Sequence, residues 1–205
     1  FISLSKIKNH FSRVKGILVR HIDQLAYIVA NHMDIPIILD EGMYTFNTEA
    51  IAMYRNICDE CTYTLSLEHS KADNIALSQY IRDSELIVYG YNRLMTSTQC
   101  VNKNTAYCDN ISHKYELVDR KLAKFNVVNI CKYCYNLLYS HKPMDIVTYA
   151  KDYTHTKAYR IQLTIEDGNE SAGIVKSIIG YIQGREEYTP IIDETNHVYI
   201  NRGIE

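Results

Sequence analysis

The first 90 residues of the chain alternate between short apolar runs and segments with helical periodicity. The runs have the length and the composition of buried strands, and they lie at residues 16–20, 35–40, 63–68 and 86–89. Amphipathic helices are predicted between these strands, at residues 22–31, 47–57 and 70–81. Asn47 and Ser70 stand where the second and third helices would begin, and both residue types cap helices.

This order of elements predicts β/α units that build a parallel sheet. The units repeat about every 22–28 residues, a spacing that suits a (β/α) barrel. Four units precede Gly90, and a closed barrel needs twice that number, so the sequence predicts a partial barrel. Because a partial barrel leaves sheet edges and apolar faces uncovered, we expect it to need a missing barrel half or a second copy of the chain.

The pattern changes after Gly90. Residues 91–114 are polar and irregular, residues 115–119 and 125–128 alternate as the strands of a hairpin, and residues 131–139 have a helical pattern. Further elements are predicted as a short segment at 143–146, a strand at 159–165, a helix at 171–183 and a return loop at 188–205. The predicted fold class is therefore α/β: a partial (β/α) TIM-type barrel followed by a cysteine-bearing α+β segment.

We expect three regions along the chain. Residues 1–92 would form half of a barrel, which the family resemblance given below implies is the C-terminal half. Residues 93–142 would form a cysteine-rich segment that holds a metal or a cluster, and residues 143–205 a C-terminal α+β segment.

Four cysteines lie within a stretch of 35 residues: Cys100, Cys108, Cys131 and Cys134. Their spacing is C-x7-C, then 22 residues, then C-x2-C. The two residues within the second pair let one turn of backbone direct both sulfurs at the same ion. Four thiolates can hold a [4Fe–4S] cluster or, as the alternative, a tetrahedral zinc ion. The sequence leaves both open, together with four buried thiols that bind nothing.

Composition and charge limit the compartment and the kinds of partner that we expect for this chain. The chain shows no secretory signal and no apolar run near the ~18 residues that a membrane span needs, so we expect no membrane partner. A chain of 205 residues does not depend on disulfides for a core, which favours the reducing cytoplasm and metal-bound cysteines. The net charge of −2 gives no overall basic field for nucleic acid, although a local basic patch remains open.

Polar residues follow the predicted strands at their carboxyl ends, where parallel sheets bind ligands. Arg20 would hold an anionic substrate, and Asp40 and Glu68 would act as acid or base or orient the substrate. These three are the candidate catalytic residues. The alternative is that they are ordinary charged residues at the junctions of strands and loops.

Three further groups of residues are weaker candidates for a functional role. Cys58 and Cys61 form a second C-x2-C motif, which we expect to be packed as buried thiols rather than to serve in redox chemistry or ligation. The rings of Tyr133, Tyr135 and Tyr139, near Lys132 and Lys142, would either stack unpaired RNA bases or pack in a core. In the tail, His197, Arg202 and Glu205 would either meet an anionic ligand or lie on the surface.

The segment from Glu85 to Gly90, followed by Cys100 ten residues later, resembles the signature of peptidase family U32, the collagenase-like proteases. Further matching pieces are Leu94-Met95, residues 117–120, residues 125–127, the Cys131–Cys134 motif and residues 202–205. Softer matches at residues 16–20, 44–47 and 64–68 extend the resemblance over nearly the whole chain. Arg93 stands where the family often has a cysteine, and Thr98 where it has a glycine.

The resemblance implies two kinds of function. The family name implies hydrolysis of peptide bonds, but the chain has neither a nucleophile-elbow serine nor an H-E-x-x-H motif. A thiol nucleophile would have to be Cys100 or Cys131 beside His113 or His141. Other members are similar to oxygen-independent hydroxylation proteins, which hold a [4Fe–4S] cluster through four cysteines and modify RNA or a quinone precursor. The four cysteines favour this second chemistry, with RNA as the substrate, over the peptidase. A non-catalytic zinc or assembly module is the third alternative.

Overall fold

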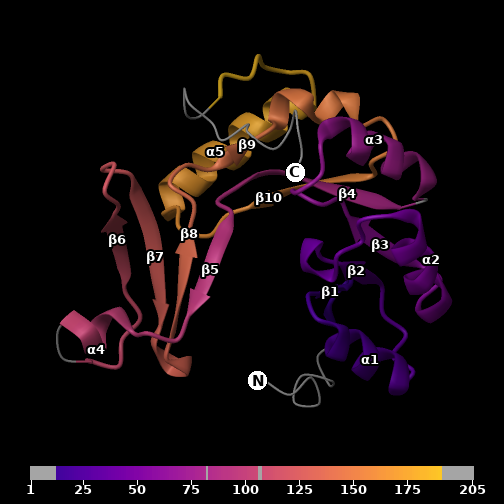
Figure 1. The fold of residues 1–205 in the computed structure, drawn as a ribbon. Helices are drawn as coiled ribbons and strands as arrows, with labels where there is room; N and C mark the ends of the chain where they lie inside the picture. Colours follow the sequence, from indigo (N-terminus) through magenta and orange to yellow (C-terminus); the bar gives the residue numbers. More distant parts are fainter. Residues whose placement is uncertain (1–12, 82, 106–107, 191–205) are drawn as a thin grey trace. The chain divides into compact units, whose positions relative to one another are not determined.

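The computed structural model describes residues 13–81, 83–105 and 108–190 and shows an α/β protein (Figure 1). A partial (β/α) barrel sheet is followed by a cysteine-bearing α+β segment, as the sequence predicts. The described residues divide into two compact units, one of residues 13–87 with 149–160 and the other of residues 88–148 with 161–190. The tail residues His197, Arg202 and Glu205 lie outside the described residues.

The first sheet contains parallel strands in the order β1-β2-β3-β4-β10, and its early elements follow the predicted alternation. In chain order these elements are β1 (Ile17–Val19), α1 (Ile22–Ala30), β2 (Ile37–Leu39), α2 (Thr48–Ile57), β3 (Cys61–Thr64), α3 (Lys71–Tyr80) and β4 (Ser84–Gly90). The predicted strand at 63–68 is shifted, because β3 begins at Cys61 and ends at Thr64. Figure 1 shows α1, α2 and α3 following one another along one side of the strands.

The two predicted helix caps are confirmed. The Asn47 side chain accepts a hydrogen bond from the backbone N–H of Ala50 at 2.8 Å, and the Ser70 hydroxyl accepts one from Asp73 at 3.2 Å. Each bond satisfies a donor that the first turn of a helix leaves unpaired. The helices then bury one apolar face against the strands, where Leu25, Ile51 and Leu77 are all less than 8% exposed.

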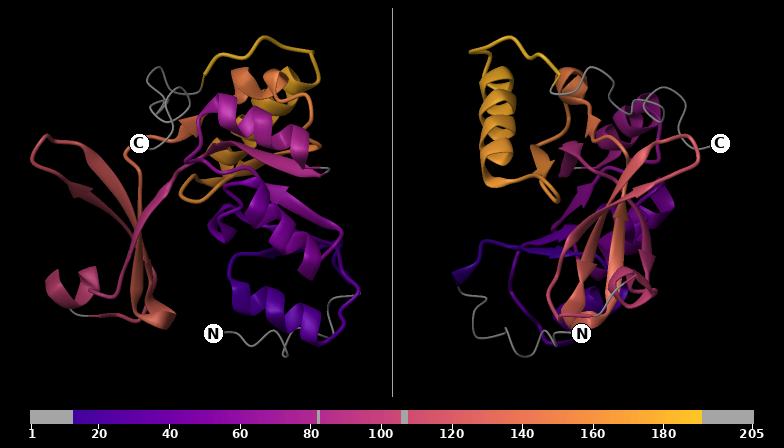
Figure 2. Two further views of the ribbon diagram at one scale, coloured as in Figure 1. Left: turned by 45° about the vertical axis from the view of Figure 1, so that its right-hand side comes forward. Right: turned by 90° about the vertical axis from the view of Figure 1, so that its left-hand side faces the viewer.

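The second sheet is antiparallel, and we call it sheet B. Its strand order is β5-β8-β7-β6, with β5 (Arg93–Ser97), β6 (Lys114–Val118), β7 (Lys124–Ile130) and β8 (Tyr135–Tyr139). The predicted hairpin is confirmed as β6 and β7, whereas β5 and the short helix α4 (Val101–Thr105) fall in the stretch predicted to be irregular. Figure 2 shows these strands twisting across one another in both views.

The helix predicted at residues 131–139 is wrong. A single 3-10 turn, Cys131–Tyr133, is followed by β8, which pairs with β7 from Ile130 opposite Tyr135 onward. An apolar and aromatic run of this length suits either a strand or a helix, so periodicity does not distinguish them. Pairing on both sides, with β7 and with β5, decides for the strand.

The remaining elements return the chain to the first sheet. They are β9 (Met144–Asp145), the 3-10 segment Val147–Asp152, β10 (Ala158–Gln162) and α5 (Gly168–Ile182). The backbone N–H of Lys157 donates to the carbonyl of Ser84 at 2.9 Å, and Gln162 lies against Gly90. The start of β10 therefore lies beside the start of β4, and the end of β10 beside the end of β4. The two strands run in the same direction.

At Gly90, β4 packs closely against β10. A Cβ atom at this position would lie 2.7 Å from the carbonyl oxygen of Gln162. Gly173, in contrast, lies on an exposed part of α5, where a Cβ would have no neighbour within 4 Å.

We therefore expect opposite effects from the same substitution at these two glycines. Gly90→Ala should lower the free energy of unfolding by about 2 kcal/mol, because the added methyl group forces the strands apart. Gly173→Ala should raise it by about 0.5–1 kcal/mol, because alanine loses less backbone entropy in a helix. Urea denaturation of both variants measures the difference, and equal stabilities would contradict this packing of β4 against β10.

Candidate functional site

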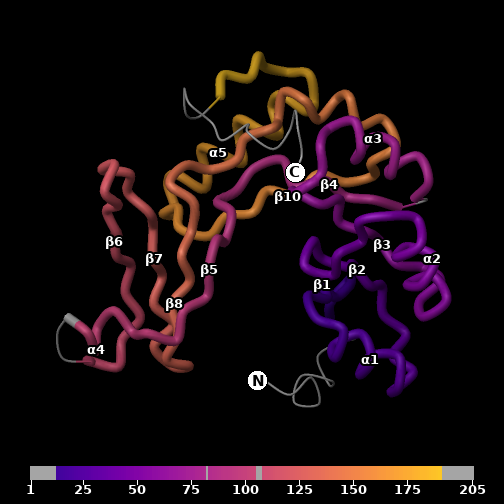
Figure 3. The backbone as a smooth tube through the Cα atoms, in the orientation of Figure 1, coloured from indigo at the N-terminus to yellow at the C-terminus, as the bar shows by residue number. Residues whose placement is uncertain are grey.

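One end of sheet B gathers the four cysteines predicted as ligands. At this end β7 finishes and β8 begins, and the four residues between them form a tight connection with the backbone N–H of Cys134 donating to the carbonyl of Cys131 at 3.1 Å. Cys134 itself has a left-handed backbone, with φ of 53°. The C-x2-C motif is thus a strand-to-strand turn, and its two sulfurs are carried by neighbouring strand ends. Figure 3 shows α4 at this same end, opposite the β6–β7 turn.

Cys100 is held at this end by two asparagines. It precedes α4 and is buried, and its Sγ accepts a hydrogen bond from the amide of Asn129 at 3.6 Å. The same amide donates to Asn136, the residue paired with Asn129 across β7 and β8. Asn136 in turn donates to the carbonyl of Gln99 at 2.5 Å. The chain of amides fixes the segment that carries Cys100 to the middle of the sheet. Neither asparagine was predicted as a site residue, although a polar residue in the buried row of two paired strands is a usable signal.

Cys108 and Cys131 lie closest together. Their Sγ atoms are 3.8 Å apart with no bond between them, and all four cysteines are free thiols. Burial is the main cause that raises the pKa of Cys131, followed by its contact with Cys108 and by the charges of Cys134 and Cys100. The topology of sheet B places the four predicted ligands at one end of the sheet, and Cys108 and Cys131 are in direct contact there.

The histidines considered as bases for a thiol nucleophile are engaged elsewhere. His113 forms an exposed ion pair with Asp109 at 2.6 Å, and the ring of His141 meets the carbonyl of Lys124 at 2.8 Å. Hydrogen bonds from the backbone N–H of Ile111 and from His113 lower the pKa of Asp109. In the described part of the chain, the structure records no contact between an imidazole and a thiol.

The donor set fits an iron–sulfur cluster or another thiophilic metal. Four thiols with no bond among them, gathered from residues 100, 108 and 131–134, are the ligands that such groups prefer. Among the described residues, no three His, Cys, Asp or Glu side chains are arranged around the position of a single ion. The contact of 3.8 Å between the sulfurs of Cys108 and Cys131 equals the separation of about 3.8 Å expected for two sulfurs bound to one zinc ion, so the arrangement does not by itself favour a cluster over zinc.

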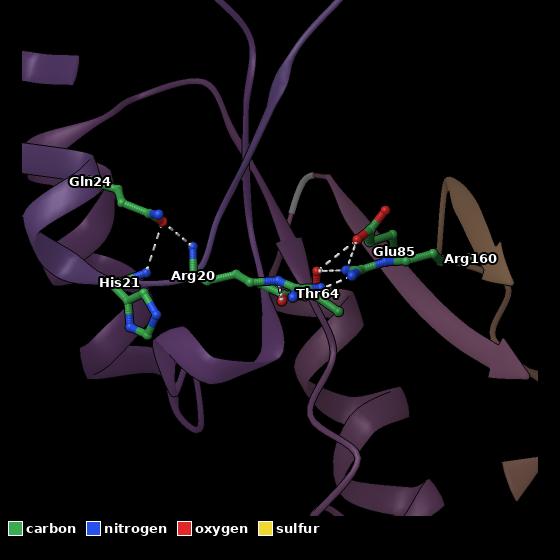
Figure 4. Close-up of polar contacts among 7 residues, drawn as sticks. Arg20, His21, Gln24, Thr64, Glu85 and Arg160 are labelled. Carbon is green, nitrogen blue, oxygen red and sulfur yellow. Dashed lines mark hydrogen bonds and ion pairs between the residues drawn. The ribbon is translucent and has the colours of Figure 1, made fainter. Parts of the chain in front are cut away.

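A second polar arrangement lies at the carboxyl ends of the first parallel strands (Figure 4). Parallel register places Val19 beside Leu39, Leu39 beside Tyr63 and Thr64 beside Glu85. The residues that follow β1 and β2 therefore join the end of β3 and the start of β4 in one row. In order across the sheet, this row is Arg20, Asp40, Thr64 and Glu85.

Arg160 of β10 closes this row into a network. Its guanidinium donates to Asp40 Oδ1 at 2.7 Å, to Thr64 Oγ1 at 2.6 Å and to Glu85. Asp40 also forms an ion pair with Arg20 Nε at 2.8 Å. Two carboxylates and two guanidinium groups thus balance one another. The side chains of Asp40, Glu85 and Arg160 are 6%, 9% and 17% exposed, whereas that of Arg20 is 48% exposed.

The structure therefore brings two of the three candidate catalytic residues together. Arg20 and Asp40 are paired, but Glu68 is exposed in the loop after β3, where its backbone N–H donates to the Ser66 hydroxyl at 3.1 Å. Glu85 and Arg160 were not among the predicted site residues. Arg160 is 120 positions from Asp40, so no local pattern could have identified it.

The interpretation of Cys58 and Cys61 as buried thiols is wrong. The two cysteines form a disulfide between the end of α2 and the start of β3. Cys61 is 4% exposed and Cys58 is half-buried. A surface hollow of about 510 Å³ lies beside this loop, lined by Arg55, Asp59, Gln79 and Tyr80. It is at the amino end of β3 and does not include the polar row at the carboxyl ends.

Comparisons with known proteins found no match to any family model, to any curated protein or to any solved structure. No helix among the described residues has the length and apolar character needed to cross a membrane. The function therefore has to be argued from the residues of this chain and their arrangement.

We expect the two arginines of the ion network to contribute unequally to the free energy of unfolding. Arg160→Met should lower the free energy of unfolding by about 3 kcal/mol, because it leaves the buried carboxylate of Glu85 without its partner. Arg20→Met should cost less than about 1 kcal/mol, because water screens a half-exposed pair. Urea denaturation at neutral pH separates the two variants. An equal decrease in the free energy of unfolding for the two variants would show that Arg160 is not the main stabilising member of the network.

The free thiols should also differ in reactivity. In metal-free protein, iodoacetamide should modify exposed Cys134 before Cys131, which is buried and has a raised pKa. Because a raised pKa leaves less thiolate at neutral pH, modification of Cys131 should increase as the pH rises above the ordinary range for a thiol. Peptide mapping by mass spectrometry measures both rates, and equal rates at neutral pH would contradict the environment described for Cys131.

Proposed function

We propose that this chain holds a [4Fe–4S] cluster through Cys100, Cys108, Cys131 and Cys134 and acts in the hydroxylation of RNA. The position of four free thiols from three separate segments at one end of sheet B, with two of the sulfurs 3.8 Å apart, is the observation that carries the cluster. The resemblance to family U32 supports the reaction, because members similar to hydroxylation proteins act on RNA. The same proposal places the protein in a reducing cytoplasm, where cluster ligands remain thiols and where the disulfide of Cys58 with Cys61 would be open to reduction.

The groups around the thiols would influence the pH dependence of cluster binding and the reduction potential of a bound cluster. Burial raises the pKa of Cys131, so ligation, which requires the thiolate, releases a proton and is favoured as the pH rises. The Asn129 amide donates to the sulfur of Cys100, and hydrogen bonds to ligating sulfurs tune the reduction potential of a cluster. A bound cluster of this type supplies single-electron transfer.

Arg20 and Asp40 are the proposed substrate-binding groups outside the cysteine centre. Arg20 is the one member of the ion network with a largely exposed side chain, so it is the member that an anionic substrate can reach. Asp40 orients Arg20 through its Nε, which leaves the outer edge of the guanidinium for a phosphate or a carboxylate. Glu68, exposed in the next loop, keeps the proposed role of an acid or base.

Peptide hydrolysis has less support from the arrangement of the residues. A cysteine nucleophile is activated by a base within hydrogen-bonding reach. His113 is paired with Asp109, and His141 is bound to a carbonyl near the β6–β7 turn. A zinc module, with the same four ligands and no catalysis, remains as the outcome that metal analysis can distinguish.

The first experiment is iron, sulfide and zinc analysis of protein purified without oxygen. We expect about four iron and four sulfide per chain, as in a [4Fe–4S] protein, with visible absorbance. Cys131→Ser and Cys134→Ser should each lose most of the iron, because a cluster of this kind needs all four ligands. The matched control is Cys58→Ser with Cys61→Ser, which removes the remaining two cysteines and should leave the iron content unchanged.

Other outcomes would overturn the proposal. About one zinc and no sulfide would make the cysteines a structural clamp. Iron that survives in Cys131→Ser would show that a different set of ligands binds it. Nucleoside mass spectrometry of RNA from cells that overproduce the chain then tests the reaction: an added oxygen should appear with the unaltered protein and be absent with Cys131→Ser.

A further inference from the structure

Basic residues are concentrated in the segment that builds sheet B and the cysteine centre. Residues 93–142 hold eight lysines and arginines against three aspartates and glutamates, a formal charge of +5. The rest of the chain holds 14 basic and 21 acidic residues, which brings the whole to −2. The net charge therefore conceals a basic sheet, and attraction of a polyanion depends on this local field rather than on the total.

The basic side chains lie at both ends of sheet B. At the cysteine end they are exposed on α4, on β6 and in the Cys131–Cys134 turn, as Lys103, Lys114 and Lys132. At the opposite end they are exposed in and beside the β6–β7 turn and on β5, as Arg120, Lys121, Lys124 and Arg93. Of these, Lys124 is paired with Glu116 at 3.1 Å and Lys114 donates to the carbonyl of Ile165 at 2.6 Å. The sheet therefore has a group of exposed basic side chains at each of its two ends.

An exposed tyrosine, Tyr133, and a half-buried one, Tyr135, lie at the cysteine end of this sheet. The side chain of Tyr133 is 44% exposed, and its ring stacks with that of Tyr135 at a centroid separation of 6.3 Å and an angle of 17°. The Lys132 ammonium lies 5.4 Å from the centre of the Tyr133 ring. A large ring held on the surface beside a cation has little role in a core. Tyr139, by contrast, is buried, so it belongs to the packing of the sheet.

We propose that sheet B binds single-stranded RNA, with bases stacked on Tyr133 and Tyr135 and the phosphates held by the basic residues at the two ends of the strands. A four-stranded antiparallel sheet with exposed aromatic rings is a known platform for unpaired bases, and base stacking together with a basic track is how single strands are bound. The choice of RNA rests on the proposed function, whereas the binding surface rests on charge and ring geometry. An acidic protein segment would use the charges but not the stacked rings.

The position of Tyr133 would bring a bound base close to the cysteines. Tyr133 lies between Cys131 and Cys134 in sequence, on the same turn. A base stacked on Tyr133 therefore lies beside the proposed cluster, and the sheet that holds the cysteines also delivers the nucleotide to them.

Binding is tested with the full chain, purified without oxygen, by fluorescence anisotropy of a labelled single-stranded RNA of mixed sequence. Arg120→Glu with Lys121→Glu should weaken the affinity about tenfold near 0.1 M salt and reduce the salt slope by about 1.4, the value for two lost phosphate contacts. These side chains project from a turn whose backbone is held by Asp119, so the fold should persist. Lys15→Glu with Lys176→Glu makes the same change in net charge at exposed positions outside residues 93–142 and should change the affinity less than twofold, by about the assay error.

The rings have a matched control in the same chain. Tyr133→Leu should weaken binding about tenfold through lost stacking. Tyr80→Leu alters a tyrosine that is equally exposed, at 44%, and that also lies beside a cation, the Arg55 guanidinium at 4.7 Å. This variant should bind RNA like the unaltered protein.

The possible outcomes separate this proposal from the proposed function. Equal effects of the two double charge reversals, or of the two tyrosine variants, would overturn the RNA surface. Equal affinity for a polyglutamate of similar length would also overturn it, because the surface would then be a site for acidic polymers. The iron and sulfide content of each variant is measured alongside its RNA affinity. A normal iron content without RNA binding would reject only this inference. RNA binding without iron would reject only the proposed cluster.

Discussion

The pairing register of β7 with β8 is the constraint on which the cysteine centre depends. Ile130 lies opposite Tyr135, so four residues must turn the chain, and two of them are Cys131 and Cys134. The same register pairs Asn129 with Asn136, whose amides hold the Cys100 segment against the sheet. A slip of one residue would turn every side chain of β8 to the opposite face and would separate the cysteines from these asparagines.

The parallel sheet is held in register by charge rather than by apolar packing alone. Arg160 connects Asp40, directly after β2, with Thr64 of β3 and Glu85 of β4. Removing one partner of a buried ion pair leaves the other charge uncompensated, which is strongly destabilising. A shifted register would separate these carboxylates from Arg160, so the network disfavours other registers. It also orients Arg20 at the edge of the sheet, so the most exposed member has a fixed direction.

The sequence was informative where structure depends on neighbours in the chain. Asn47 and Ser70 identified the helix starts, and the short apolar runs identified β1, β2 and β4, because caps and burial patterns are local properties. The C-x2-C motif likewise identified two cysteines that the structure places in one turn between β7 and β8. What could not be predicted depends on contacts between distant residues. Arg160 reaches Asp40 only after the sheet has formed, and residues 135–139 become a strand because β5 and β7 pair with them on both sides.

Cys134 has a left-handed backbone, with φ of 53°. For a side chain with a Cβ this conformation costs about 1 kcal/mol relative to the ordinary helical region, a cost that glycine does not have. Tyr44 and Leu122 have the same conformation, so the fold tolerates this cost at several turns. If Cys134 is a ligand, as we propose, the bond made by its sulfur would offset the cost of the turn that positions it.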